Sequence, residues 1–346
     1  MDKSLDQWIA DTYAAACASV RAAVAAMALA PAERARMAFA AEQWLAAAHP
    51  DNFLATNGAA IRRAVETGGA SLAEGMRLLA ADVARGQVAN TDLAAFEVGR
   101  DLAVTPGEVV LRNPLVELIQ YRPATARVGA RPLVIVPPCI NKYYILDLRP
   151  ENSFVAHCVA AGHTVFMVSW RNPGPAESGL GWDDYLESGV IAPLAAARAI
   201  CRADAVNALG FCIGGTLLAA ALAVLAARGE QPAASLTLLA TLLDFSDAGA
   251  LGVFIDPAAV ALREAQIGAG GILAGRELSA VFAALRPREL VWNYVANGYL
   301  KGEAPPAFDL LYWNADATGL PGPMACWYLR NLYLGNSLRE PGRLTC

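Results

Sequence analysis

The chain has 346 residues, of which 56% are hydrophobic and 17% charged, with a formal net charge of −5. This composition can bury a large core, and the acidic balance argues against a nucleic acid partner. The acidic start Met1–Asp6 does not resemble a secretory leader, and the apolar run Leu217–Ala227 is too short to span a bilayer. The seven cysteines follow neither a disulfide nor a zinc spacing, so we expect reduced thiols, no metal site and a cytoplasmic location.

The first part of the chain, residues 1–93, predicts a helical N-terminal domain. Apolar residues recur at helical spacing between Trp8 and Val20, and Pro31 is placed to begin a second helix. Two further helices are expected around residues 59–67 and 72–85. This region contains no pattern of catalytic residues.

From Phe96 the pattern changes to alternating strands and helices. A strand pair is expected across Asn113-Pro114, and four apolar runs have the composition of strands buried on both faces. Strands alternating with helices of this length predict a mostly parallel sheet with crossover helices on both faces. The expected strands are 109–112, 116–121, 132–137, 164–170, 205–209 and 234–243, and the main helices are 153–161, 182–201 and 216–227.

The segment 208–216 joins the end of a strand to a helix through the pattern Gly210-x-Cys212-x-Gly214. This is the nucleophile elbow of an α/β-hydrolase-type sheet, with cysteine in place of serine. Strand and helix nearly touch at such a bend, so only small residues fit at Gly210 and Gly214. The helix start favours a thiolate at Cys212, and the backbone N–H of Ile213 supplies half of an oxyanion hole. The alternative is a structural cysteine in an ordinary turn.

Two further positions are candidates for this site. The loop after the strand 132–137 is where this fold places its second oxyanion donor, which we assign to the backbone of Ile140. Beside it, Cys139 is either a second reactive thiol at the substrate site or a packed loop residue. Asp244 ends the strand after the elbow and is either an acid at the substrate site or the cap of a turn.

The cysteine lacks an evident base. A cysteine nucleophile usually needs a histidine, which in this fold follows it in the sequence. The three histidines, His49, His157 and His163, all precede Cys212, and His49 is interpreted as the C-terminal cap of a helix. The strands that would carry the acid and base are also missing, so we expect a sheet that is incomplete at its C-terminal end.

Beyond Asp247 the alternation of strands and helices stops. Residues 248–340 mix helical pieces with many aromatic residues, and no further sheet strand is evident. We interpret this stretch as a cap over the elbow, within a catalytic domain 94–346. Its aromatic side chains either line a substrate tunnel or form the core of the cap.

Several motifs in order resemble class I polyhydroxyalkanoate synthases, from about Phe53 to the last residues. They are residues 137–148, 168–173, 210–216, 243–245 and 314–323. The resemblance implies an α/β-hydrolase domain behind a helical domain, and polymerisation of (R)-3-hydroxyacyl-CoA, such as 3-hydroxybutyryl-CoA, with release of CoA and no separate cofactor. It implies that Cys212 is the nucleophile, and that the family's catalytic Asp and His lie in a segment absent from this C-terminally truncated chain.

The resemblance also implies a homodimer, either free in the cytoplasm or at the surface of a polyester granule. We expect the chain alone to be inactive or nearly so, because the missing base contributes roughly 100- to 10,000-fold. Two other functions remain open. One is a thiol esterase or depolymerase of the same fold, and the other is a non-catalytic fragment that dimerises or binds granules.

Overall fold

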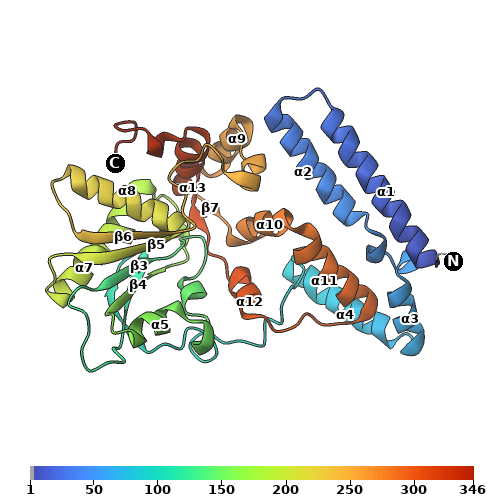
Figure 1. The fold of residues 1–346 in the computed structure, drawn as a ribbon, viewed down its shortest axis with the longest axis horizontal. Coiled ribbons are helices and arrows are strands. Elements are labelled where there is room, and N and C mark those ends of the chain that lie inside the picture. Colours follow the sequence, from blue (N-terminus) through green and yellow to red (C-terminus); the bar gives the residue numbers. More distant parts are fainter. Residues whose placement is uncertain (1–3) are drawn as a thin grey trace. The chain divides into compact units, whose positions relative to one another are not determined.

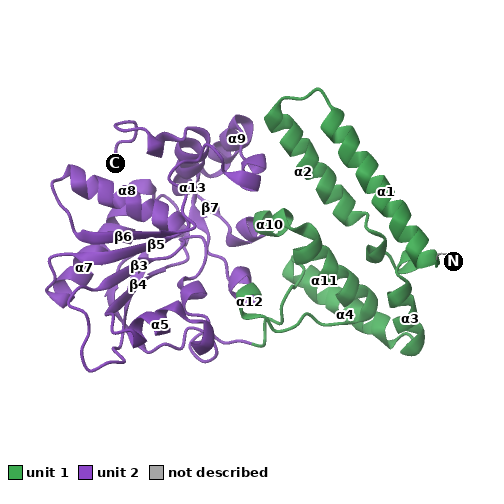
Figure 2. Ribbon diagram, in the orientation of Figure 1, with its two compact units in different colours: residues 1–95, 280–311 green, residues 96–279, 312–346 purple. Residues whose placement is uncertain are grey.

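The computed structural model describes residues 4–346 and divides into two compact units (Figure 2). The first unit comprises residues 1–95 and 280–311, and the second comprises residues 96–279 and 312–346. The expected helical region 1–93 falls within the first unit. The stretch 248–340, interpreted from sequence as a cap, is divided, because its residues 280–311 belong to the first unit.

The described residues of the first unit form helices and the turns between them (Figure 1). Its N-terminal pair of helices is joined by an ion pair between Arg21 and Glu42. Residues 296–300 approach the fourth helix so closely that a Cβ at Gly75 would lie 2.1 Å from the Tyr299 carbonyl oxygen. The helices are α1 (Leu5–Ala26), α2 (Pro31–Ala47), α3 (Gly58–Glu66), α4 (Ala70–Arg85) and α11 (Asn293–Val295), with α10 (Gly275–Leu285) and α12 (Asp309–Ala315) spanning its boundaries.

The predicted role of His49 is wrong. Helix α2 ends at Ala47, and the His49 ring does not cap it. Instead Nδ1 of His49 accepts a hydrogen bond from the N–H of Asp51 at 3.1 Å and so caps the short turn Pro50–Asn52 that follows. The proline that signals the end of one helix here begins the next turn.

The second unit is built on a six-stranded sheet in the order β1-β2-β4-β3-β5-β6. Strands β4, β3, β5 and β6 are parallel, while β1 and β2 form the antiparallel pair predicted across Asn113-Pro114. The mostly parallel α/β architecture expected from the sequence is therefore confirmed. The strands are β1 (Gly107–Arg112), β2 (Val116–Tyr121), β3 (Leu133–Val136), β4 (Val165–Trp170), β5 (Val206–Phe211) and β6 (Ala233–Leu239).

Helices cover both faces of this sheet. Val134 and Val136 of β3 face a cluster shared with several helices, whereas Ile135 between them faces a second cluster that includes Val155 and Val159. This alternation explains the uninterrupted apolar sequence of the strand. The first cluster involves α6 (Trp182–Leu186), α7 (Ala192–Cys201) and α8 (Ile213–Ala227), and the second involves α5 (Phe154–Ala160).

The edge strand β6 differs from the interior strands. Its residues 234–237 are exposed, although the strand is as apolar as its neighbours. It ends at Leu239, because Ala240 adopts a positive φ of 45° and turns the chain away.

The sequence also missed a short antiparallel pair, β7 (Ile272–Leu273) with β8 (Leu320–Pro321), within the stretch where no strand was expected. The remaining helices of the second unit are α9 (Pro257–Ile267) and α13 (Gly322–Tyr328). No helix in the described part of the chain has the length and apolar character that crossing a membrane requires.

Candidate active site

Cys212 stands alone between the last residue of β5 and the first residue of α8. Its backbone has φ 54° and ψ −131°, a conformation that costs a non-glycine residue of the order of 1–3 kcal/mol. Two hydrogen bonds hold it there: the N–H of Cys212 donates to the Leu239 carbonyl at 2.9 Å, and its own carbonyl accepts from the N–H of Gly215 at 2.9 Å. The bend is therefore fixed by both the next strand and the following helix.

Three glycines make room for this bend. A Cβ at Gly210 would lie 2.3 Å from the Cα of Gly215, so the strand and helix touch at this pair. A Cβ at Gly214 would lie 2.3 Å from the carbonyl oxygen of Pro137, at the end of β3. Gly210 thus allows the strand to contact the helix, and Gly214 allows the helix to contact the end of β3. The sequence analysis missed Gly215, although the Gly-Gly pair at 214–215 was a visible signal.

The thiol of Cys212 is half-buried. Burial raises its pKa, and a hydrogen bond from the N–H of Ile213 opposes only part of this shift. The helix start therefore favours the thiolate, as expected, but burial outweighs it and the net direction of the pKa shift is upward. Ile213 is the first residue of α8, so its N–H is not used by the hydrogen bonds of the helix and can serve as an oxyanion donor. Its catalytic role stays a prediction.

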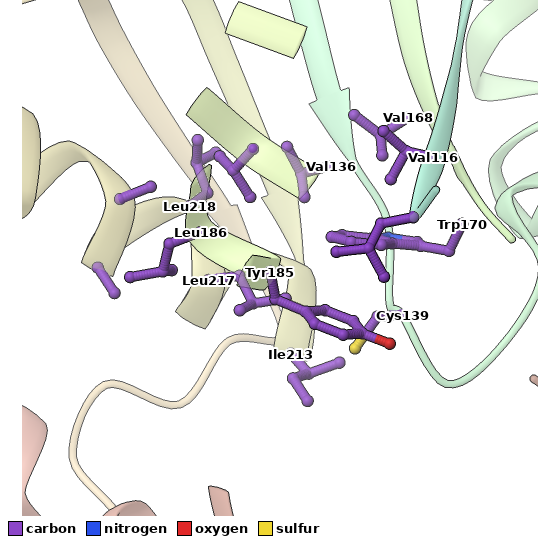
Figure 3. Packing of buried hydrophobic residues seen from close by; sticks show 14 of the residues in the cluster. Val116, Val136, Cys139, Val168, Trp170, Tyr185, Leu186, Ile213, Leu217 and Leu218 are labelled. Carbon is purple, nitrogen blue, oxygen red and sulfur yellow. The ribbon is translucent and has the colours of Figure 1, made fainter. Parts of the chain in front are cut away.

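Cys139 lies in the loop after β3 and is buried against Tyr185 and Trp170 (Figure 3). Burial raises the pKa of its thiol, and the nearby Cys212 raises it further. The structure thus brings the two cysteines into one neighbourhood but leaves Cys139 neutral and enclosed. This arrangement matches the packed-loop interpretation better than that of a second reactive thiol.

The loop that contains Ile140 is held by a distant part of the chain, residues 313–334, which we call the covering segment. The carbonyl of Ile140 accepts a hydrogen bond from the N–H of Thr318 at 2.9 Å, and Nε1 of Trp313 donates to the Lys142 carbonyl at 2.7 Å. The Tyr144 hydroxyl donates to Asp316 at 2.8 Å. Half-buried Ile140 is thereby fixed in place, and its proposed oxyanion role stays a prediction.

Asp244 is exposed and is used by its own turn. It accepts hydrogen bonds from Nδ2 of Asn336 at 2.7 Å and from the N–H of Ser246 at 2.9 Å, and it pairs with Arg339 at 3.2 Å. These partners, Asn336 first, lower the pKa of its carboxyl to about 2. The contacts are those of the turn-capping alternative, and a role at the substrate site stays a prediction.

The two histidines of the second unit lie away from the elbow. His157 is exposed on α5, and His163 is exposed immediately before β4. Because parallel strands point the same way, His163 stands at the amino end of the sheet, whereas Cys212 follows the carboxyl end of β5. His49 belongs to the first unit. Within the second unit, neither His157 nor His163 therefore stands where it can serve as the base for Cys212.

The family comparisons agree with this geometry. Residues 132–338 match the family described as alpha/beta hydrolase fold, and the chain belongs to this family. Residues 2–158 match a second family, described as "Poly-beta-hydroxybutyrate polymerase (PhaC) N-terminus".

Curated relatives narrow the group further. The chain is 57% identical over 317 residues to "Poly(3-hydroxyalkanoate) polymerase subunit PhaC" of Cupriavidus necator. The matched region covers 90% of this chain and 54% of that protein. It is 45% identical over 306 residues to "Poly(3-hydroxyalkanoate) polymerase" of Methylorubrum extorquens, covering 87% of this chain and 51% of that protein. The resemblance to polyhydroxyalkanoate synthases is thereby confirmed. The chain spans about half the length of these relatives.

Proposed function

We propose that Cys212 accepts the acyl group of an (R)-3-hydroxyacyl-CoA and passes it to a hydroxyl group, as in polyester synthesis. The observation that carries this proposal is the position of Cys212, held at a strand-to-helix bend directly before the first residue of α8. The names of the relatives, poly(3-hydroxyalkanoate) polymerases, support the choice of acyl donor and product.

The first step is an exchange of thioesters. The Cys212 sulfur attacks the carbonyl carbon of the acyl-CoA, a C–S bond to Cys212 forms, and the C–S bond to CoA breaks. The Cys212 proton leaves with CoA, which departs as its thiol. The N–H of Ile213, with that of Ile140, stabilises the negative charge that develops on the carbonyl oxygen.

The second step forms the ester. A hydroxyl oxygen, from another monomer or the growing chain, attacks the acyl carbon. The new C–O bond replaces the C–S bond to Cys212, and the hydroxyl proton goes to the sulfur. A thioester keeps the acyl group activated until this step, whereas a serine ester would already have lost that activation. This difference accounts for cysteine at the apex of the elbow.

Proton transfer limits what this chain does alone. The raised pKa of Cys212 leaves the thiol protonated near neutral pH, and the two histidines of the second unit stand away from it. We infer that the 346-residue chain acylates Cys212 slowly and does not turn over at the rate of a complete synthase. The acylation rate should rise with pH, because hydroxide replaces the missing base.

The test uses the purified 346-residue chain and (R)-3-hydroxybutyryl-CoA. Intact mass spectrometry should show one added hydroxybutyryl group, peptide mapping should place it on Cys212, and chromatography should show an equal amount of free CoA. Cys212→Ala should abolish the adduct. Cys139→Ala is the matched control and should retain it, because Cys139 is buried and neutral.

Three outcomes would contradict the proposal. Acylation that persists in Cys212→Ala would show that Cys212 is not the nucleophile. Free 3-hydroxybutyrate as the product would indicate a thiol hydrolase. No adduct at any pH would leave a non-catalytic, dimerising or granule-binding role as the better explanation. Turnover at a complete synthase's rate would instead contradict the inference that the base is lacking.

A further inference from the structure

A small polar cavity lies in the first unit, where residues 51–59 meet residues 288–301. Both stretches belong to that unit although they are far apart in the sequence (Figure 2). The volume of the cavity is about 140 Å³, the liquid volume of roughly four or five water molecules. Among the described residues, its lining consists of four asparagines, two cationic side chains, one carboxylate and two alanines. Such a lining suits a small charged ligand rather than an apolar one.

The charges that line this cavity do not cancel. Arg288 pairs with Asp51 at 3.1 Å, across 237 residues of sequence. Half-buried Lys301 has no carboxylate partner among the described residues, and its Nζ donates instead to the neutral Oδ1 of Asn297 at 2.9 Å. Two cations therefore stand against one carboxylate in the lining. A bound anion would balance the remaining positive charge.

Asp51 and Asn52 add hydrogen-bond acceptors to the same lining. The Oδ1 of Asn52 is buried without a hydrogen-bond partner, while its Nδ2 donates to the carbonyls of Ala46 and Ala47 at 2.8 and 2.9 Å. A fully ionised anion such as sulfate would meet these acceptors with its own oxygens, which is unfavourable. Hydrogen phosphate carries both acceptor oxygens and a P–OH donor, so it can satisfy the cations and the acceptors together.

We propose that this cavity binds a hydrogen-phosphate group. Lys301 and Arg288 donate to its oxygens, and its P–OH donates to Asp51 or to Oδ1 of Asn52. Because the two walls come from separate stretches of the chain, the bound phosphate links them and stabilises the helical unit. Cys212 belongs to the other unit, so the test of this site is independent of the reaction proposed there.

The first test measures protection of Lys301 in the unmodified 346-residue chain. The chain is acetylated with sulfosuccinimidyl acetate in phosphate, sulfate or chloride at equal ionic strength, and peptide mapping compares Lys301 with Lys142 of the second unit. Isothermal titration calorimetry gives the Kd for inorganic phosphate, expected at about 1 mM. At ten times this concentration, phosphate should slow acetylation of Lys301 about tenfold and leave Lys142 unchanged. Sulfate should protect Lys301 less than phosphate does.

The second test assigns the binding to the cavity. Lys301→Gln removes the charge but keeps a long polar side chain, and it should weaken phosphate binding about tenfold, the effect of one lost charge-assisted hydrogen bond. Arg286→Gln is the matched control, because Arg286 lies in the same stretch, is exposed and pairs with Glu289 outside the cavity. It should bind phosphate as the unmodified chain does.

Glycerol 3-phosphate separates two sources of the phosphate group. Binding as tight as that of inorganic phosphate, or tighter, would assign the site to a phosphomonoester of a larger molecule, and weaker binding would assign it to free phosphate. Both results support the site. Equal protection by phosphate and sulfate, equal protection of Lys301 and Lys142, unchanged binding in Lys301→Gln, or no binding of either phosphate would each overturn it.

Discussion

The elbow and the covering segment contribute to the same site, but the first is formed by neighbouring residues and the second by long-range contacts. In the elbow, nine consecutive residues, 208–216, supply the strand end, the bend and the helix start. The covering segment instead meets the loop 139–144 across more than 170 residues of sequence, as in the hydrogen bond from Tyr144 to Asp316. The nucleophile is therefore placed by local sequence, whereas its surroundings depend on the fold of the whole unit.

The largest loss of stability is expected at Gly214, where the elbow has no free space for a side chain. Gly214→Ala would place a Cβ 2.3 Å from the Pro137 carbonyl oxygen and 2.4 Å from that of Val136, and neither backbone can move cheaply. We expect a loss of about 3 kcal/mol in the free energy of unfolding, or failure to fold. Denaturant unfolding measures this loss.

The matched control for this substitution is Gly252→Ala. No heavy atom lies within 4 Å of the Cβ that it would add. Its effect should stay within about 0.5 kcal/mol. Equal effects of the two substitutions would show that the elbow is not tightly packed. The statement that local sequence places the nucleophile would then be contradicted.

Local sequence was sufficient to predict the sheet and the elbow. The alternation of strands and helices predicted the parallel sheet, and the spacing of Gly210 and Gly214 around Cys212 predicted the bend. The pKa of Cys212 could not be predicted in this way. It depends on how the folded chain buries the thiol, and the helix start alone suggested the opposite direction.

The pH dependence of Cys212 labelling sharpens this point. Because burial raises the pKa of the thiol, the rate of alkylation by iodoacetamide should still rise at pH 9, the ordinary thiol value. Below its pKa, the thiolate fraction and the rate increase about tenfold per pH unit. Peptide mapping separates Cys212 from the exposed Cys346. A rate that levels off below pH 9 would mean that the helix start outweighs burial.

A smaller effect is expected at the contact between the covering segment and the loop after β3. Tyr144→Phe removes the hydroxyl that donates to Asp316 at 2.8 Å, in a side chain that is 1% exposed. We expect the free energy of unfolding to fall by about 1 kcal/mol. Tyr185→Phe, also buried, is the control and should cost less, because its hydroxyl makes no hydrogen bond among the described residues. Equal losses would indicate that packing, rather than this hydrogen bond, attaches the covering segment.

The division of the predicted cap shows why long-range contacts escape a sequence reading. Residues 280–311 have the same apolar and aromatic character as the rest of 248–340, yet they pack with α4, where Gly75 admits Tyr299 and Asp82 accepts its hydroxyl. Asp82 and Gly75 are unremarkable in a helix that is 16 residues long. Asp82 also accepts hydrogen bonds from Arg85 and from the N–H of Ala89, but the role of Gly75 depends on a partner more than 200 residues away.

The smallest effect on stability is expected at Asp244, which joins the turn after β6 to Asn336 and Arg339, two residues that follow the covering segment. Its pKa is lowered to about 2 by Asn336 and Ser246, from 3.8 in an unfolded chain. The ionised carboxylate therefore stabilises the fold above pH 3.8, and this contribution is lost as the pH falls to about 2. Asp244→Asn should lower the melting temperature slightly at pH 7, and the difference should vanish near pH 2. Asn336→Ala should reproduce part of this pH dependence, because Asn336 is the largest cause of the shift. A difference that persists unchanged at pH 2 would assign the effect to the shape of the turn, and Asp244 would then act through local geometry, as the elbow does.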